Sequence, residues 1–160
     1  MSAVDISSSD ELRDLYRELI LDHARNPRHF RALDNATHTA EGINPLCGDK
    51  LRLYLLIDDN DTVTDAAFEG SGCAISIASA SLLTDLVRGL SVEQAHACFS
   101  AVTERLTGSK CGHDHVGVDL GKIRALDGVR EFPARVKCAT LAWHALNSAI
   151  AGHSAPVSTE

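Results

Sequence analysis

The sequence predicts an α+β fold in which a small three-stranded antiparallel sheet packs against about five or six helices. Leucine or isoleucine occupies every second position from residue 51 to residue 57, which is typical of a strand with one buried face. A turn-forming cluster at 58–61 and an apolar run at 63–69 predict the return strand of a hairpin. Elsewhere apolar residues recur at helical spacing, so we expect helices to cover the sheet.

A helix and a less regular stretch are predicted before this hairpin. Apolar residues share one helical face from Leu12 to Ile20, and Ser8 with Glu11 matches a capping box. Pro27 is expected to end this helix. Residues 28–46 are expected to be irregular or to form an edge strand.

Helices separated by one polar loop are predicted after the hairpin. The first spans about 74–88, and Ser91 opens the second with a capping pattern. Residues 107–119 read as a polar loop, and 120–126 as a short helix. Pro133 marks the entry to the last helix, which carries an apolar stripe.

Length and composition fit one domain over residues 1–160, with frayed termini at 1–9 and 152–160. The net charge of −7 argues against a nucleic-acid binder, which would normally present a basic face. The first nine residues lack the pattern of a secretory signal, and no run of about eighteen apolar residues could span a membrane. We therefore expect a cytoplasmic protein with no nucleic-acid or membrane partner.

The five cysteines indicate metal ligands, nucleophiles or core residues, because disulfides are rare in a reducing compartment. Cys47 lies between Pro45 and Gly48, which favour a turn that presents the thiol from a loop. Asp49 follows two residues later, close enough for both side chains to meet one ion. The alternative is an ordinary loop with a small buried cysteine.

Two further cysteines occupy predicted helix starts. Cys73 follows a glycine-rich turn, and a helix N-terminus favours the thiolate form that binds metals. Cys138 follows Pro133, where Arg135 and Lys137 would favour thiolate further. The alternatives are a core cysteine in a glycine-eased turn at the first position and a helix-interior cysteine at the second.

Cys47, Asp49, Cys73 and Cys138 together form a set of three thiols and one carboxylate. Such a set suits tetrahedral zinc or an iron–sulfur cluster better than calcium or magnesium. The chain has no CxxC pair, so these ligands would have to converge by folding.

The other cysteines and histidines lack a complete ligand set. Cys98 lies among apolar helical positions, which predicts a core residue. Cys111, His113 and His115 could chelate, but they lie in the polar loop without a second paired segment. The histidines expected at the surface are His23, His29, His38 and His96.

Three cysteine-containing segments carry a resemblance to a known family: 44–49 (Asn-Pro-Leu-Cys-Gly-Asp), 68–76 and 135–143. The opening segment 15–28 also looks like that family's first helix. Over residues 11–150 the chain resembles the SufU/IscU family of iron–sulfur cluster assembly proteins, related to the N-terminal domain of NifU. The resemblance implies a SufE/NifU-like fold.

Within the family, the chain looks like SufU rather than IscU. IscU-type scaffolds carry a histidine immediately before the last cysteine, where this chain has Lys137. They also carry a Leu-Pro-Pro-Val-Lys chaperone-docking segment, where residues 132–137 read Phe-Pro-Ala-Arg-Val-Lys. Residues 108–127 match the insertion that marks SufU proteins.

The SufU resemblance implies a zinc-dependent sulfurtransferase, with Zn²⁺ held by Cys47, Asp49, Cys73 and Cys138. Cys47 would accept persulfide sulfur from a SufS-type cysteine desulfurase and pass it toward SufB/SufC/SufD-type scaffold machinery. Arg135 is the candidate for holding a displaced thiolate or carboxylate. The alternative for this arginine is a surface position at the helix end.

Two other functions stay open. One is a scaffold that assembles a [2Fe–2S] or [4Fe–4S] cluster on the same ligands, which Lys137 disfavours by resemblance. The other is a structural zinc domain that only binds partners. That domain would tolerate another ligand, such as histidine, in place of Cys47, whereas a persulfide requires a sulfur atom.

Overall fold

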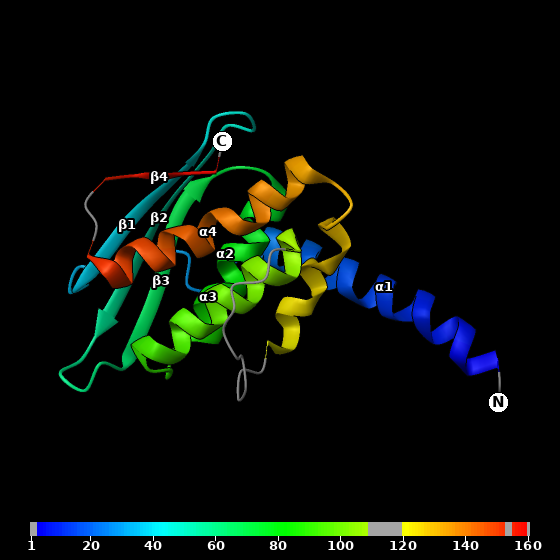
Figure 1. Cartoon of the computed structure of the whole chain (residues 1–160), viewed down its shortest axis with the longest axis horizontal. Helices are drawn as coiled ribbons and strands as arrows, with labels where there is room; N and C mark the ends of the chain where they lie inside the picture. The colour runs from blue at the N-terminus through cyan, green and yellow to red at the C-terminus, as the bar shows by residue number, and fades with distance from the viewer. Residues whose placement is uncertain (1–2, 109–119, 153–154, 160) are drawn as a thin grey trace.

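The computed structural model describes residues 3–108, 120–152 and 155–159, with side chains from residue 13 onward. One layer is a sheet, and helices cover one of its faces (Figure 1). Within these ranges, no helix is long and apolar enough to cross a membrane.

The sheet has four strands in the order β3-β2-β1-β4. β1 (His38–Asn44), β2 (Asp49–Ile57) and β3 (Val63–Ser71) form an antiparallel meander. The alternation pattern predicted β2 and its return strand β3, whereas β1, within the stretch expected to be irregular or an edge strand, lies inside the sheet. The buried side chains of Leu51, Leu53 and Leu55 all point to the helical side of β2.

The prediction of a purely antiparallel three-stranded sheet was wrong, because a fourth strand pairs parallel to β1. β4 (Val157–Ser158) aligns with Gly42 and Ile43, and the Thr159 amide donates to the Ile43 carbonyl at 3.2 Å. Residues 157–159, expected to be frayed, are therefore held on the sheet edge. A two-residue strand has no measurable periodicity, so its sequence could not predict it.

The described residues contain five helices, within the expected range. They are α1 (Ala3–Arg25), α2 (Ala74–Val87), α3 (Val92–Thr107), the 3₁₀ helix η1 (Gly121–Val129) and α4 (Pro133–Ala151). The predicted capping box of Ser91 and Gln94 opens α3, whereas α1 begins before the capping pattern predicted at Ser8. α2 and α4 contact the sheet, and α3 packs on α4 (Figure 1).

The core lies between the sheet and helices α2 and α4. Trp143 of α4 is fully buried, and its indole N–H donates to the Ser79 hydroxyl of α2 at 3.1 Å. Phe68 of β3 is buried in the same hydrophobic core. This packing fixes α2 and α4 relative to the β1–β2 turn, and the turn and the two helices carry one predicted thiol ligand each.

Candidate metal centre

The tight turn that joins β1 to β2 carries Cys47. Asn44 and Asp49 are paired across the hairpin, and the Cys47 amide donates to the Asn44 carbonyl at 3.2 Å. Gly48 adopts φ +71°, a left-handed conformation that glycine takes without steric strain. The turn leaves the Cys47 side chain exposed, as Pro45 and Gly48 predicted.

Asp49 is buried, with 1% exposure, and both of its carboxylate oxygens accept hydrogen bonds from α2. Oδ1 accepts from the Cys73 amide at 2.8 Å, and Oδ2 accepts from the Ser76 hydroxyl at 2.7 Å. A Cβ at Gly72 would lie 2.5 Å from Oδ1. Glycine is therefore required there for the carboxylate to reach the start of the helix.

Cys73 is the N-cap residue of α2, the helix-terminal position predicted for it. Its Sγ accepts from the Ser76 amide at 3.5 Å and lies 3.9 Å from Oδ2 of Asp49. The side chain is half-buried. Its thiol therefore faces both the positive end of the helix dipole and the neighbouring carboxylate.

Cys138 corrects one sequence prediction, because α4 begins at Pro133 and the thiol lies in the second turn rather than at the helix start. Its exposure is 3%, and Asn44 Nδ2 donates to Sγ at 3.6 Å. Burial raises the pKa of the Cys138 thiol, and hydrogen bonds with Asp49 and the other two site thiols act in the same direction. The predicted effects of the helix start, Arg135 and Lys137 are outweighed by burial.

Ligand atoms of Cys47, Asp49 and Cys138 lie within 4.8 Å of one another. Cys73 adjoins this group through its 3.9 Å contact with Asp49. Ligands around tetrahedral zinc stand about 3.5–3.8 Å apart, given the usual Zn–S and Zn–O lengths. The four side chains therefore fit such a metal after small movements, and their sulfur-rich chemistry suits zinc or iron.

Two residues that support these ligands were not predicted. Ser76 is fully buried and contacts three of the four candidate ligands, through the Cys73 thiol, the Asp49 carboxylate and the Cys138 carbonyl (3.2 Å). Asn44 is also fully buried, and its Oδ1 has no hydrogen-bond partner among the described residues. For Ser76, the available sequence signal was a serine three residues after a helix-capping cysteine, within an apolar run.

A groove of about 1400 Å³ opens beside the site, and Cys47, Cys73 and Cys138 all line it. Arg135 lines the same groove from the first turn of α4. Its side chain is exposed, with Cζ 5.9 Å from the centroid of the Phe132 ring. The structure thus places the predicted assisting arginine in the same groove as the thiols.

The remaining candidate ligands lie elsewhere. Cys98 is buried in α3, as predicted, and burial raises its pKa to about 11. Cys111, His113 and His115 fall outside the described residues.

Comparison with known proteins agrees with this architecture. The family model for the NifU-like N-terminal domain matches residues 15–157. The chain belongs to this family. The resemblance to SufU/IscU proteins found in the sequence is therefore confirmed.

Curated members of the family align with nearly the whole chain. A zinc-dependent sulfurtransferase SufU from Bacillus subtilis is 42% identical over 146 residues, which cover 91% of this chain and 96% of that protein. An iron–sulfur cluster assembly scaffold protein IscU from Streptococcus pyogenes is 40% identical, covering 88% of this chain and 85% of its own length.

A solved structure of a family member shares the fold. That protein, from Fervidobacterium islandicum, is named as an iron–sulfur cluster assembly scaffold protein for the SUF system, and it is 32% identical, with a TM-score of 0.74. The alignment covers 83% of this chain and 94% of that structure.

Proposed function

We propose that this chain is a zinc-dependent sulfurtransferase of iron–sulfur cluster assembly that accepts persulfide sulfur from a SufS-type cysteine desulfurase. The metal ligands would be Cys47, Asp49, Cys73 and Cys138, and the downstream recipient would be SufB/SufC/SufD-type scaffold machinery. The resemblance to SufU segments and the similarity to a relative named zinc-dependent sulfurtransferase support this assignment.

The observation that carries the proposal is the difference in exposure among the clustered thiols. Cys47 is exposed on a turn, whereas Cys73 is half-buried and Cys138 has 3% exposure. A persulfide on a partner protein must reach the attacking sulfur directly. Cys47 is therefore the acceptor, and the two less accessible thiols with Asp49 keep the site assembled.

The transfer is a thiol-exchange reaction at sulfur. The Cys47 thiolate attacks the outer sulfur of the donor's R–S–SH group, a new S–S bond forms, and the donor's S–S bond breaks. The electron pair leaves with the donor as R–S⁻, and the acceptor becomes Cys47–S–SH, so no external oxidant or reductant is needed. Zinc, when bound, would supply a Lewis acid that lowers thiol pKa values.

Residues around Cys47 would keep the site ordered during the transfer. Asp49 accepts hydrogen bonds from the Cys73 amide and the Ser76 hydroxyl, which would keep its carboxylate oriented when Cys47 leaves the metal. Arg135, which lines the groove beside the thiols, would hold a displaced thiolate by charge and hydrogen bonding.

A second function is an assembly scaffold for a [2Fe–2S] or [4Fe–4S] cluster, since the same thiolates can bind iron. Similarity to a relative named IscU scaffold supports this alternative. Lys137, which replaces the histidine expected before the last cysteine of IscU-type scaffolds, favours sulfur transfer instead.

The test combines metal and sulfide analysis of the purified protein with desulfurase activity in its presence and absence. Sulfur transfer predicts about one zinc per chain and no labile sulfide. It also predicts activation of the desulfurase, with activation abolished in Cys47→Ala. The matched control, Cys98→Ala, removes a buried thiol outside the site and should retain activation. A brown protein containing iron and sulfide, with little activation, would support the scaffold function instead.

A further inference from the structure

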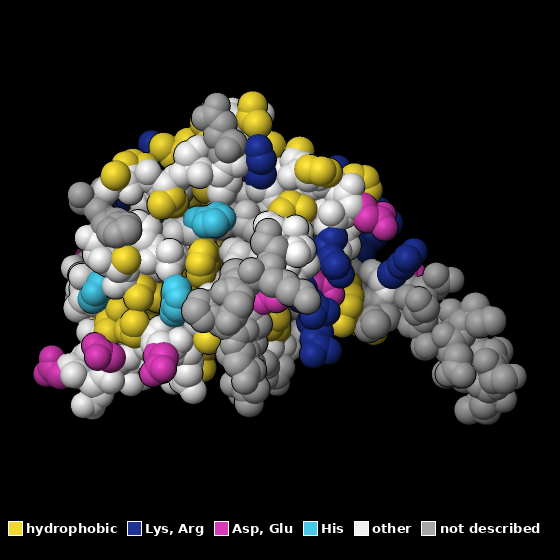
Figure 2. Space-filling model, viewed as in Figure 1, with side chains coloured by type: hydrophobic (Ala, Val, Ile, Leu, Met, Phe, Trp, Pro, Cys, Tyr) yellow, Lys and Arg dark blue, Asp and Glu magenta, His cyan; other side chains and the backbone are white. Residues whose placement is uncertain are grey.

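The groove beside the thiols is rich in arginine although the whole chain carries a net charge of −7. Arg13 and Arg17 line it from α1, Arg130 from the end of η1, and Arg135 from α4. All four side chains are exposed. Figure 2 shows Lys and Arg side chains gathered where α1 leaves the body of the molecule.

The acidic residues of the groove do not balance this charge. Asp127 is held by Arg105, which donates to its two oxygens from Nε and Nη2, both at 2.7 Å. Glu131 is the other carboxylate in the lining. None of the four groove arginines forms an ion pair with a side chain that the structure describes. Among the described residues, the groove therefore presents arginines without an ion-pair partner, and their positive charge attracts anions from solution.

The floor of the groove is apolar. Ile20, Leu106 and Val129 lie there and join the hydrophobic core below. An apolar floor with guanidinium groups around it fits a peptide that carries both carboxylates and apolar side chains. A bare phosphate chain would satisfy the arginines and leave the floor uncovered.

We infer that this groove is the docking surface for an acidic, partly apolar segment of the protein that donates sulfur to Cys47. The inference rests on the proposed function for the identity of the sulfur donor. It adds the chemistry of the donor segment that binds in the groove. Cys47 lines the same groove, so a segment bound there brings the donor sulfur close to the acceptor. Unpaired arginines raise the association rate of an acidic partner, and salt screens that attraction.

Charge reversal tests the surface in the full-length zinc-loaded protein. The variants are the double substitution Arg13→Glu/Arg17→Glu and the single substitution Arg130→Glu. The matched controls are Arg25→Glu on α1 and Arg124→Glu on η1, which are exposed, change the net charge equally per site and do not line the groove. Zinc content and circular dichroism check that every variant remains folded.

The probe is a SufS-type cysteine desulfurase, with its affinity measured at about 0.05 M and 0.3 M salt. We expect the groove variants to weaken binding by about tenfold or more at the lower salt, mainly through the association rate. The controls should stay within about twofold, and the wild-type affinity should fall at the higher salt. Groove variants that bind as tightly as the controls would overturn the docking surface.

Mass spectrometry of the chain after incubation with the desulfurase detects any persulfide on Cys47. This measurement separates the docking inference from the proposed function. If the wild type binds the desulfurase through the groove but Cys47 gains no persulfide, the docking surface stands and sulfur transfer fails. If Cys47 gains a persulfide and the groove variants lose no affinity, transfer stands and the docking surface fails. A wild-type chain that does not bind the desulfurase at all would overturn the docking surface.

Discussion

Helix α2 joins two polar clusters that differ in how completely their groups are paired. At its N-terminal end, Cys73 and Ser76 contact the candidate metal ligands through sulfur contacts of 3.5–3.9 Å and two hydrogen bonds to Asp49, at 2.8 and 2.7 Å. Toward its C-terminal end, Asp85 and Arg88 take part in ion pairs. The same helix therefore supports two sites with opposite needs for an external ligand.

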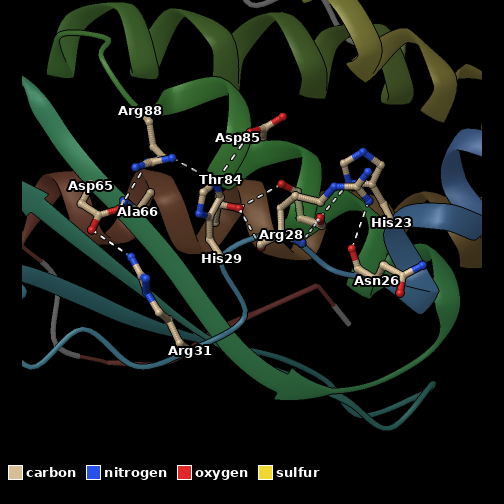
Figure 3. Close-up of polar contacts among 11 residues, drawn as sticks. His23, Asn26, Arg28, His29, Arg31, Asp65, Ala66, Thr84, Asp85 and Arg88 are labelled. Carbon is tan, nitrogen blue, oxygen red and sulfur yellow. Dashed lines mark hydrogen bonds and ion pairs between the residues drawn. The ribbon is translucent and has the colours of Figure 1, made fainter.

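In the C-terminal cluster, two arginines are paired with one carboxylate (Figure 3). Asp65 of β3 accepts from Arg31 at 3.1 Å and from Arg88 at 3.3 Å. His29 Nε2 lies 3.5 Å from Asp85 on α2. These contacts tie the segment after α1 to a strand and a helix, and Asp65 is held between two arginines, so the cluster is structural.

The N-terminal cluster lacks such complete pairing. Its described groups include three thiols and one carboxylate but no cation held against them by an ion pair. Buried groups left short of strong partners are expensive unless a ligand completes them. The difference between the two ends of α2 supports the proposed metal site at the N-terminal end.

The largest expected effect is a loss of zinc affinity on substitution of Ser76 in the N-terminal cluster. Ser76→Ala removes the hydroxyl that holds Asp49 and leaves the helix backbone in place. We expect zinc affinity to fall about 100-fold, the upper end for an outer-shell partner, because the Ser76 hydroxyl bonds to both the Asp49 carboxylate and the Cys138 carbonyl. Competition with a chromophoric zinc chelator measures the change.

The control is Ser79→Ala, one turn further along the same helix. Ser79 is equally buried and also bonds across to α4, through Ala139 and Trp143, but it contacts none of the four candidate ligands. We expect it to lower the free energy of unfolding by about 1–3 kcal/mol, with zinc affinity within about twofold of wild type. Equal losses of zinc affinity in both variants would show that Ser76 acts only through helix stability.

The sequence predicted the elements whose own pattern is strong. β2 follows the alternation from Leu51 to Ile57, and α3 begins at the predicted capping box. The pairing of β4 with β1 depends on contacts between residues more than a hundred positions apart, which no local pattern encodes. The position of Cys138 within α4 was misjudged because Pro133 fixes only the first turn.

The sequence predicted the candidate metal ligands but not the residues that hold those ligands in place. The segments around Cys47, Cys73 and Cys138 match family motifs, so the resemblance nominated them before the fold was known. Ser76 and Asn44 lie in two of those segments, but their roles depend on burial and on cross-element hydrogen bonds. Such bonds follow from the packing of α2 and α4 on the sheet, which composition and spacing do not specify.

His23 of α1 is buried against α2, although a surface position was expected for it. Its exposure is 1%, its Nδ1 is 2.7 Å from the Ser81 hydroxyl of α2, and its Nε2 has no described partner. Burial, followed by the charge of Arg28, lowers the pKa of His23, while Asp22 and Asp85 oppose the shift. The imidazole is therefore held neutral between α1 and α2.

This lowered pKa predicts how stability depends on pH. The unfolded chain takes up a proton on His23 near its ordinary value of 6.5, while the folded protein does so only at lower pH. The unfolded state then binds more protons, so stability falls as the pH decreases below about 6.5 and stops falling once the folded imidazole is protonated.

Urea unfolding of wild type and His23→Gln between pH 7.5 and 5 measures this effect. We expect the variant to lose about 1 kcal/mol at pH 7.5, the net value of one buried hydrogen bond. Its stability should fall less steeply with decreasing pH than that of the wild type. His144, whose pKa burial also lowers, is present in both proteins and contributes equally to both slopes. Parallel slopes would show that His23 does not contribute to the pH dependence.

The smallest effect is expected at the paired charges of the C-terminal cluster. Arg31→Ala removes one of the two cations on Asp65 and leaves Arg88 at 3.3 Å, so the carboxylate stays paired. Arg31 is also half exposed, at 51%, where salt and side-chain entropy weaken an ion pair. We expect a loss of about 0.5 kcal/mol in the free energy of unfolding and no change in zinc affinity, measured by urea titration and chelator competition. A change in zinc affinity would mean that the two ends of α2 are energetically coupled, and the helix would then transmit strain from its structural cluster to the thiols.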